Sequence, residues 1–352
     1  MKRKFYHVFF LENNYYYKFK EFIDLNFDST EHEIIFMTHA SFNKSNLSRV
    51  RWILNQLRKI VAIQLKVWNS RKIFIHLMPT NHYLLFWLFN YFSLKKCYWI
   101  TSGKDVYYPK IKATGNAKRT IEAIRKIVIP KIGAVCGYKS DYEFLVKNYE
   151  ITENHFITFI PIRGQDFDGV EALIFNDSMP AKILLGNSAD PSNHHLEVFD
   201  MLTKFKGANL EIYCPLSYGG SKGYSELVIQ SGVELFNSSF KPLTQYIEIE
   251  EYNDFLNQIK IGIMNHRRQQ GLGNILTLLY LGKKVYMRSQ DTPFPFFKQL
   301  GLNIFDIENI AESSFQDFES FTSDQAEVNR RIITGTYGTQ NLKYLWGKIF
   351  DS

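Results

Sequence analysis

Residues 183–195 read ILLGNSADPSNHH, an apolar run that passes into a polar segment. The apolar run predicts a buried strand, and Ser192 or Asn193 is able to cap a helix that begins directly after it. The turn between strand and helix contains Gly186, Asn187 and Ser188. Ligands of open parallel sheets bind at such carboxyl ends of strands, where a glycine lets a phosphate come close. An ordinary strand-to-helix loop explains the same residues.

The same alternation of short apolar and longer amphipathic runs extends through the chain on both sides of this segment. We predict strands at 5–11, 33–39, 72–78, 96–102, 133–137, 155–161, 182–185, 210–214, 233–236, 260–264, 284–287 and 303–305. Helices are expected at 47–68, 81–92, 116–129, 140–148, 192–205, 224–231, 249–258, 274–281, 294–300 and 325–350. Strands and helices that take turns in this way predict an α/β protein with mostly parallel sheets.

The pattern restarts after residues 163–181, a stretch of weak periodicity that is typical of a linker. We therefore expect two doubly wound Rossmann-like domains facing a cleft, residues 1–170 and 180–324. A helical segment, 325–352, is expected to pack back towards the first domain. Nucleotide-sugar glycosyltransferases of the GT-B architecture are built in this way, and so are periplasmic binding proteins. The latter carry secretion signals, and no small-residue cleavage site follows the first apolar run here.

The charge of the chain is unevenly distributed along its 352 residues. Residues 1–175 carry 26 basic and 15 acidic side chains, whereas residues 176–352 carry 16 and 20. A basic first half suggests an anionic partner such as nucleic acid, anionic lipid headgroups or a phosphorylated substrate. A solvated surface without a partner is the alternative.

Few features point to metal, disulfide or membrane-spanning structure. The three cysteines have no metal-type spacing, and the longest apolar stretch, 83–94, has 12 residues where a membrane span needs about 20. We therefore expect a cytoplasmic protein that does not cross the bilayer. The aromatic run 82–92, followed by Lys95 and Lys96, suits a membrane interface, with burial against a sheet as the alternative.

A second strand-to-helix segment, NHRRQQGLGNILTLLYLGKKV at 265–285, gathers basic and glycine residues at a helix start. The side chains and glycines at this start are Arg267, Arg268, Gln269, Gln270, Gly271, Gly273 and Asn274. Free backbone amides and the helix dipole favour an anion there, so the segment predicts a diphosphate site. It lacks both the Walker GK[ST] sequence and the third glycine of a dinucleotide fingerprint. We expect Arg268 and the amides at 271–274 to stabilise the leaving group.

A third cluster, WITSGKDVYY at 99–108, ends a predicted strand of the first domain. Asp105 is expected in a loop facing the cleft, where its carboxylate would act on an acceptor hydroxyl as a base; an aspartate that only stabilises a turn is the alternative. His76, at another strand end, is the second candidate base. His7 lies within a strand, where a structural role is commoner.

At these segments the sequence resembles glycosyltransferase family 56, bacterial enzymes of enterobacterial common antigen synthesis. These enzymes add 4-acetamido-4,6-dideoxygalactose from its TDP donor to a polyprenyl-diphosphate-linked saccharide. The resemblance rests on GNSADPSNHH at 186–195, PLSYGG at 215–220, GVELF at 232–236 and RQQGLGN at 268–274. Weaker matches are WITSGKD at 99–105 and IPIRG at 160–164. It adds Pro215 and Tyr218 to the expected nucleotide-binding residues.

The resemblance implies a GT-B fold in which the second domain holds the nucleotide diphosphate and the first holds the lipid-linked acceptor. It implies neither cofactor nor metal, because basic side chains and a helix N-terminus neutralise the leaving diphosphate. We therefore expect a glycosyltransferase that is peripheral on the inner face of the plasma membrane and has no nucleic-acid partner. A non-catalytic nucleotide-sugar-binding protein is one alternative. A nucleic-acid-binding protein is another, although no RNP, helix-turn-helix or zinc pattern supports it.

Overall fold

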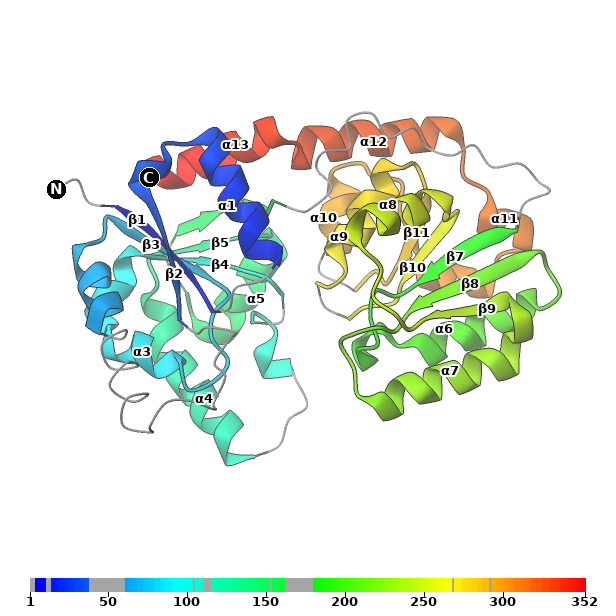
Figure 1. Ribbon diagram of the computed structural model, residues 1–352, viewed down its shortest axis with the longest axis horizontal. Coiled ribbons are helices and arrows are strands. Elements are labelled where there is room, and N and C mark those ends of the chain that lie inside the picture. The colour runs from blue at the N-terminus through cyan, green and yellow to red at the C-terminus, as the bar shows by residue number, and fades with distance from the viewer. Residues whose placement is uncertain are drawn as a thin grey trace. The chain divides into compact units, whose positions relative to one another are not determined.

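The computed structural model describes residues 4–10, 14–37, 61–103, 105–110, 115–151, 154–161, 180–267, 269–290 and 293–352. The chain divides into two compact units. Unit 1 comprises residues 1–162 and 342–352, and unit 2 comprises residues 163–341. Each unit contains one six-stranded parallel sheet covered by helices (Figure 1).

The sheet of unit 1 has the strand order β2-β1-β3-β4-β5-β6, and all its strands are parallel. The strands are β1 Phe5–Phe9, β2 His32–Phe36, β3 Lys72–His76, β4 Cys97–Ile100, β5 Ala134–Cys136 and β6 Asn154–Phe156. The helices are α1 Asn14–Asn26, the helical segment 61–69, α3 Leu84–Phe89, α4 Asn116–Val128, α5 Lys139–Tyr149 and most of α13 Thr339–Asp351. Short 3-10 helices are η1 Ser29–Glu31, η2 Tyr91–Lys96, η3 Tyr108–Lys110 and η4 Ile129–Lys131.

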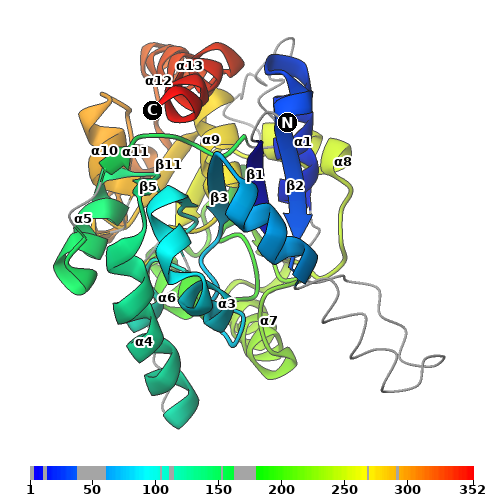
Figure 2. The same cartoon turned by 90° about the vertical axis from the view of Figure 1, so that its left-hand side faces the viewer.

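Strands β1 and β3 are buried along their whole length, as expected for central strands of a parallel sheet covered on both faces. On one face, α3 and α4 pack together, with Leu84, Trp87, Ile124 and Val128 in the core (Figure 2). The registers of β3, β4 and β5 bring their carboxyl ends to one edge of the sheet. That edge carries the loops in which Asp105 and His76 were expected to act.

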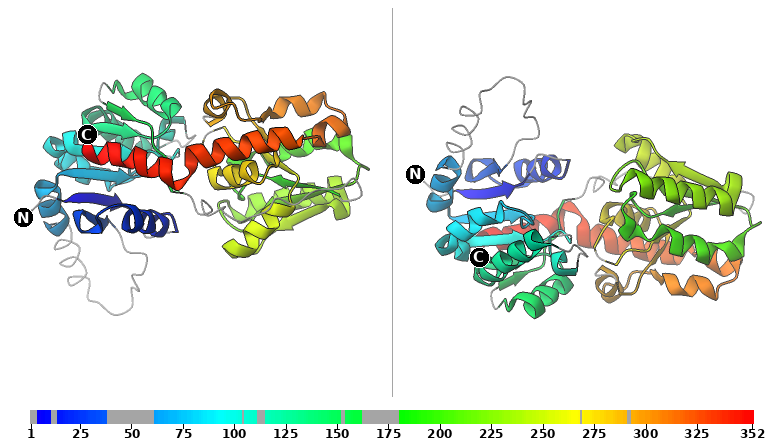
Figure 3. Two further views of the ribbon diagram at one scale, coloured as in Figure 1. Left: turned by 90° about the horizontal axis from the view of Figure 1, so that it is seen from above. Right: turned by 90° about the horizontal axis from the view of Figure 1, so that it is seen from below.

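Most of the last helix of the chain, α13, belongs to unit 1, from Leu342 onward (Figure 3). Lys72 Nζ donates to the carbonyl oxygens of Ile349 and Phe350 at 2.8 and 3.1 Å, at the helix end where backbone acceptors lack intrahelical donors. Trp346 is fully buried, and its Nε1 donates to the carbonyl of Phe159 at 3.1 Å. A cation at a helix C-terminus also complements the helix dipole, so these contacts explain why the segment docks here.

The sheet of unit 2 has the order β12-β11-β10-β7-β8-β9 and is likewise parallel. Its strands are β7 Ala181–Leu185, β8 Leu210–Pro215, β9 Phe240–Leu243, β10 Ile261–Met264, β11 Lys284–Met287 and β12 Phe305–Asp306. Its helices are α6 His195–Leu202, α7 Lys222–Phe236, α8 Ile249–Gln258, α9 Leu272–Tyr280, α10 Pro293–Gln299, α11 Phe315–Glu319 and α12 Ser323–Tyr337. Short 3-10 helices are η5 Pro191–Asn193, η6 Thr203–Phe205, η7 Asn237–Ser239 and η8 Ile307–Ala311. Figure 1 shows α6 and α7 on one face of this sheet and α8 and α9 on the other.

Chain order reverses between β7 and β10 in this sheet. From β7 the chain proceeds outward through β8 to β9, then returns to place β10 on the other side of β7. The loops that leave β7 and β10 therefore lead to helices on opposite faces of the sheet, α6 and α9. In open α/β sheets this is the place where ligands bind.

The structure contains two helices that were not predicted, α1 and α11, and two predicted elements have another form. The expected strand 233–236 is the last turn of α7, and the strand is β9, four residues further on. Val228, Gly232 and Phe236 recur every four residues on the buried face of α7, and Gly232 packs so closely on the Phe240 ring that an added Cβ would lie 2.6 Å from it. The single helix expected at 325–350 is two helices, because α12 ends at Gly338, where a Cβ would lie 2.3 Å from the carbonyl oxygen of Thr334.

Candidate active site

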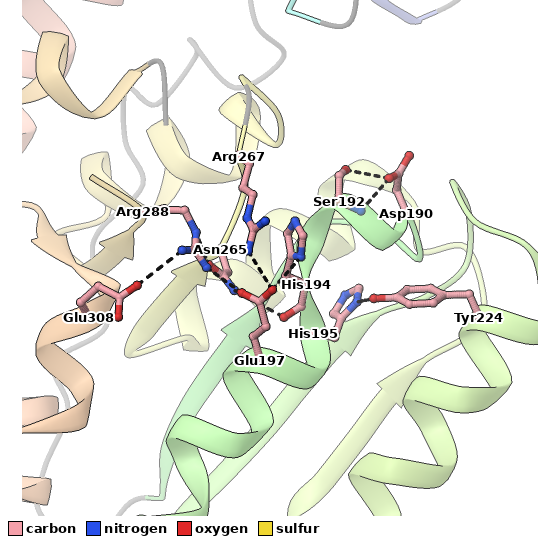
Figure 4. Close-up of polar contacts among 10 residues, drawn as sticks. All are labelled: Asp190, Ser192, His194, His195, Glu197, Tyr224, Asn265, Arg267, Arg288 and Glu308. Atoms are coloured by element: carbon pink, nitrogen blue, oxygen red, sulfur yellow. Dashed lines mark hydrogen bonds and ion pairs between the residues drawn. The ribbon is translucent and has the colours of Figure 1, made fainter. Parts of the chain in front are cut away.

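The loops that follow β7 and β10 contact each other at the point of strand reversal. Gln270 joins them, since its Nε2 donates to Asn187 Oδ1 at 3.0 Å and its Oε1 accepts from Ser192 Oγ at 2.6 Å. Asp190 Oδ1 in turn accepts from the Ser192 backbone amide at 2.9 Å and caps the short helix η5 (Figure 4). Asn187 and Gln270, which come from two distant segments, are thus in direct contact.

Asn193 and His266 form the buried floor under these loops. Asn193 Oδ1 accepts from the Asn187 backbone amide at 3.0 Å and from His266 Nε2 at 2.9 Å, while Asn193 Nδ2 donates to the Ser188 carbonyl at 3.0 Å. Gly186 lies directly above, with φ +71° and the position of a Cβ only 2.7 Å from Asn193 Oδ1. Glycine is therefore required at 186, because any larger residue would displace the side chain that shapes the loop.

The N-terminus of α9 opens onto this site. Its N-cap is Gly271, at φ +62°, which has no side chain to bond the first amides of the helix. The amides of 272–274, which include Gly273, belong to the first turn, where no intrahelical acceptor exists. Gln269 precedes the helix, and Asn274 donates from Nδ2 to the Tyr252 hydroxyl at 2.9 Å. These amides and the positive end of the helix dipole suit an anion.

A third loop, which follows Pro215 at the end of β8, packs against the first. The carbonyl of Tyr218 accepts from the Ala189 amide at 2.7 Å, and its hydroxyl accepts from Asn187 Nδ2 at 3.4 Å. Gly220 permits this approach, since a Cβ there would lie 2.0 Å from the Ala189 carbonyl oxygen. The Tyr218 side chain remains 58% exposed, so a large aromatic surface borders the site.

A charged cluster lies at the same edge of the sheet, around Glu197 in the first turn of α6 (Figure 4). We define the Glu197 cluster as Glu197, His194, Asn265, Arg267 and Arg288. Partial burial opposes ionisation of Glu197, but the Asn265 amide and the charges of its basic neighbours outweigh it and lower the pKa of Glu197. The carboxylate is therefore ionised at neutral pH.

Sequence reasoning missed Asn193, His266, Glu197 and Arg288. Asn193 and His266 stand within the two quoted segments, and Arg288 directly follows a predicted strand, so position at a strand end was an available signal. Nothing local marks Glu197, because its role depends on residues 68 to 91 positions away. Arg268, the expected leaving-group residue, lies outside the described residues.

The structure corrects the expected position of Asp105. Its side chain is 1% exposed. Oδ2 accepts from the Met78 amide at 2.9 Å and from Trp99 Nε1 at 2.7 Å, and Oδ1 accepts from the amides of Ser102 and Val106 at 3.0 and 3.1 Å. Burial raises the pKa of Asp105 against the effect of these donors. Asp105 thus fixes two strand-end loops to each other and does not face a binding surface.

His76 is also buried, and it continues a chain of histidines through the sheet. His76 Nε2 lies 3.1 Å from His7 Nδ1, and His7 Nε2 lies 2.9 Å from His32 Nδ1. The rings of Phe9 and His76 stack at 4.1 Å. Burial lowers the pKa of both His7 and His76 well below the ordinary value, so they are neutral. Neither Asp105 nor His76 can reach an acceptor hydroxyl without local opening.

Metal-binding clusters and membrane-spanning helices are both absent from the described residues. No group of three or more His, Cys, Asp or Glu side chains in the described ranges is arranged to hold a metal ion. No helix in the part of the chain that the structure describes has the length and apolar character needed to cross a bilayer.

Two parallel α/β units, with a helix N-terminus at the strand reversal of the second, form the architecture of GT-B glycosyltransferases. Solved structures agree. A glycosyltransferase from Rickettsia africae is 13% identical, with 99% of this chain and 98% of that chain covered and a TM-score of 0.68. Anabaena HepE in complex with UDP and glucose is 9% identical over 100% of both chains, with a TM-score of 0.67. Sucrose-phosphate synthase from Thermosynechococcus elongatus is 10% identical, with 99% and 98% coverage and a TM-score of 0.65.

The sequence itself specifies the family. The family described as 4-alpha-L-fucosyltransferase, glycosyl transferase group 56, matches residues 31–320. The chain belongs to glycosyltransferase family 56. The predicted family, fold class and enzyme class are thereby confirmed.

Proposed function

We propose that the protein transfers a 4-acetamido-4,6-dideoxyhexose, or a related deoxysugar, from a TDP-sugar to a polyprenyl-diphosphate-linked saccharide. The observation that carries this proposal is the meeting of three strand-end loops around the N-terminus of α9. They surround an anion site with neutral donors and an exposed tyrosine, a combination suited to a nucleoside diphosphate. Family membership and the resemblance to transferases of surface polysaccharide synthesis supply the sugar and the acceptor.

The reaction breaks the bond between the sugar C1 and the diphosphate oxygen, and TDP leaves with the electron pair. The acceptor hydroxyl oxygen forms the new bond to C1 and loses its proton. Negative charge therefore develops on the leaving oxygen, next to the amides of 272–274 and the helix dipole. We infer that these fixed dipoles, with nearby arginines, stabilise the leaving group without a metal ion.

The proposed acceptor requires contact with a membrane, because a polyprenyl diphosphate lies in a bilayer. Unit 1 presents an apolar surface, which we define as Val61, Leu65, Trp68, Leu85, Phe89 and Phe92. Their exposed fractions range from 40% for Leu85 to 96% for Phe92. Val61, Leu65 and Trp68 are spaced four and three apart, which places them on one face of the helical segment 61–69. Leu85 and Phe89 are likewise four apart on α3, and Phe92 follows in η2.

The two halves of the apolar surface lie side by side. Asn90 Nδ2 donates to Gln64 Oε1 at 2.9 Å, and Lys96 Nζ donates to the carbonyl of Trp68 at 3.0 Å. The inward faces of the same helices, with Val67, Leu84 and Trp87, are buried in the core. The inward face of these helices is thus buried in the core, and the outward face is the one available to a membrane. Exposed Lys95 and the basic first half favour an anionic lipid surface, on the cytoplasmic side of the plasma membrane.

We expect the double variant F89S/F92S to bind anionic liposomes at least tenfold more weakly than the wild type. Each phenylalanine that enters the interface loses apolar contact with water, and wild-type binding should also decrease with salt. Co-sedimentation measures both effects. L227S/V233S changes two exposed apolar residues of α7 in unit 2 and is the matched control. Equal binding of the wild type and F89S/F92S would contradict the membrane surface.

The donor proposal is tested by thermal shift with TDP, UDP, GDP and CMP, followed by turnover with a TDP-deoxysugar. A ligand that binds only the folded state raises the melting temperature, so TDP should give the largest shift. Transfer to a polyprenyl-diphosphate-linked saccharide should then release TDP. Binding without turnover would favour the non-catalytic alternative, and no shift with any nucleotide would contradict the donor site.

A further inference from the structure

The two carboxylate oxygens of Glu197 have different surroundings. Oε2 accepts from Arg288 Nη2 at 2.7 Å and from Asn265 Nδ2 at 3.2 Å. Arg288 is itself fixed, since its side chain is 12% exposed and its Nε donates to Asn265 Oδ1 at 2.9 Å. Its Nη1 also lies 3.4 Å from Glu308 Oε1. This half of the Glu197 cluster is a framework that holds the carboxylate in place.

The other oxygen, Oε1, has an exposed partner. It lies 3.0 Å from Arg267 Nη2 and 3.0 Å from His194 Nδ1, and the Arg267 side chain is 57% exposed (Figure 4). Exposed ion pairs of this kind contribute little to stability, because water screens them and the long side chain loses freedom. Arg267 can therefore leave Oε1 at small cost. Glu197 would still be held by Arg288, Asn265 and His194.

Arg267 stands where an arriving anion would bind. It follows β10 and precedes the N-cap of α9, Gly271, by four residues. A guanidinium binds phosphate through two parallel charge-assisted hydrogen bonds, which are stronger than an exposed ion pair with one carboxylate oxygen. The charges of Arg267 and Arg288 are at present balanced by Glu197 and Glu308, so the cluster offers an incoming anion little net attraction.

We propose that Arg267 is a mobile phosphate-binding arm of the donor site, which Glu197 holds until the diphosphate arrives. Arg267 then exchanges Glu197 Oε1 for phosphate oxygens, while Arg288 and Asn265 keep the carboxylate in position. His194, already 3.0 Å from Oε1, takes over that oxygen. The identity of the ligand as a nucleoside diphosphate rests on the proposed function; the exchange itself requires only an anionic phosphate group.

The exchange predicts opposite effects for its two partners. By calorimetry, Arg267→Gln should weaken binding of TDP and of inorganic pyrophosphate about fivefold to tenfold, because the arm is lost. Glu197→Gln should strengthen both about threefold, because the competing charge is lost. In the double variant the gain should disappear and binding should match Arg267→Gln, since both effects act through one guanidinium.

Matched controls lie on α12, which presents exposed Arg331 and exposed Glu327, the ion-pair partner of half-buried Arg330. Arg331→Gln and Glu327→Gln should change both affinities less than twofold. Arg267→Gln should leave the melting temperature unchanged because the side chain is exposed. Glu197→Gln should lower it, because the nearly buried Arg288 loses the charge of its ion-pair partner. The double variant shares that loss and shows whether the affinity change comes from Arg267.

The pyrophosphate titration separates this inference from the proposed function. If the wild type fails to bind TDP but binds pyrophosphate with this order of variants, the arm is supported and the nucleotide assignment is contradicted. If TDP binds and turns over but Glu197→Gln is not tighter and Arg267→Gln is not weaker, the arm is contradicted and the function stands. Absence of pyrophosphate binding to every variant also contradicts the arm.

Discussion

Replacing Gly271 by valine is expected to weaken TDP binding by more than tenfold, or about 1.4 kcal/mol and upward. Gly271 has φ +62°, a region that a β-branched residue avoids at a cost of roughly 1–3 kcal/mol. Its Cβ would lie 3.0 Å from His266 Cε1 and 3.1 Å from Asn187 Cβ. The substitution therefore shifts the floor of the site and the first turn of α9 together, and isothermal calorimetry with TDP measures the result.

The control for this substitution is Gly207→Val. Gly207 has φ +89° and nothing within 4 Å of the position of a Cβ, so it shares the backbone strain without touching the site. Both variants should lose stability, but Gly207→Val should bind TDP like the wild type. If the two variants lose affinity equally, general destabilisation explains the effect and the placement of the diphosphate at α9 is wrong.

The contact between the loops after β7 and β10 could be predicted because its signals are local. A glycine after an apolar run marks the carboxyl end of a strand, and those ends share one edge of a parallel sheet. Asn187 and Gln270, 83 residues apart, could therefore be placed together without knowing that they bond. Asn193, which supports both loops from below, could not, because hydrogen bonds across the floor depend on three-dimensional packing. The expected cap at Ser192 or Asn193 was wrong, because Asp190 caps η5 and no side chain caps α6.

The wrong predictions of secondary structure arose where one local sequence pattern is compatible with two structures. The run at 233–236 is apolar for four residues, which fits a buried strand as well as the last turn of a helix. The helix is favoured by the packing of Gly232 on Phe240. This contact forms across a turn and cannot be predicted from a short stretch of sequence. The aromatic run 82–92 is similar, since periodicity shows two faces but not that one of them, with Phe89, stays exposed.

The role of Asp105 could not be predicted for the same reason. An aspartate after a strand suits a base that faces a ligand, and it equally suits an acceptor for the backbone amides of its own loop. The deciding facts are the approach of the Met78 amide, from the loop after the neighbouring strand, and of the Trp99 indole. These contacts lead to a prediction that separates the two roles.

Asp105→Asn is expected to lower the free energy of unfolding of unit 1 by about 3 kcal/mol or more. The carboxylate accepts four buried N–H groups, two on each oxygen, whereas an amide has one acceptor oxygen and would present its own N–H groups to two donors. Each buried donor left unsatisfied costs about 1–3 kcal/mol. All five tryptophans of the sequence lie in the residues of unit 1, so urea unfolding followed by tryptophan fluorescence reports this unit alone.

TDP affinity should be retained in this variant, because every residue of the proposed donor site lies in unit 2. Asp24→Asn, an exposed partner of Lys20 on α1, is the matched control and should change stability by less than about 1 kcal/mol. Turnover by Asp105→Asn should decrease only in proportion to the folded fraction of unit 1. A variant that unfolds like the wild type and still loses turnover a hundredfold would instead restore Asp105 as a catalytic base, because a lost proton transfer slows chemistry without loosening the fold.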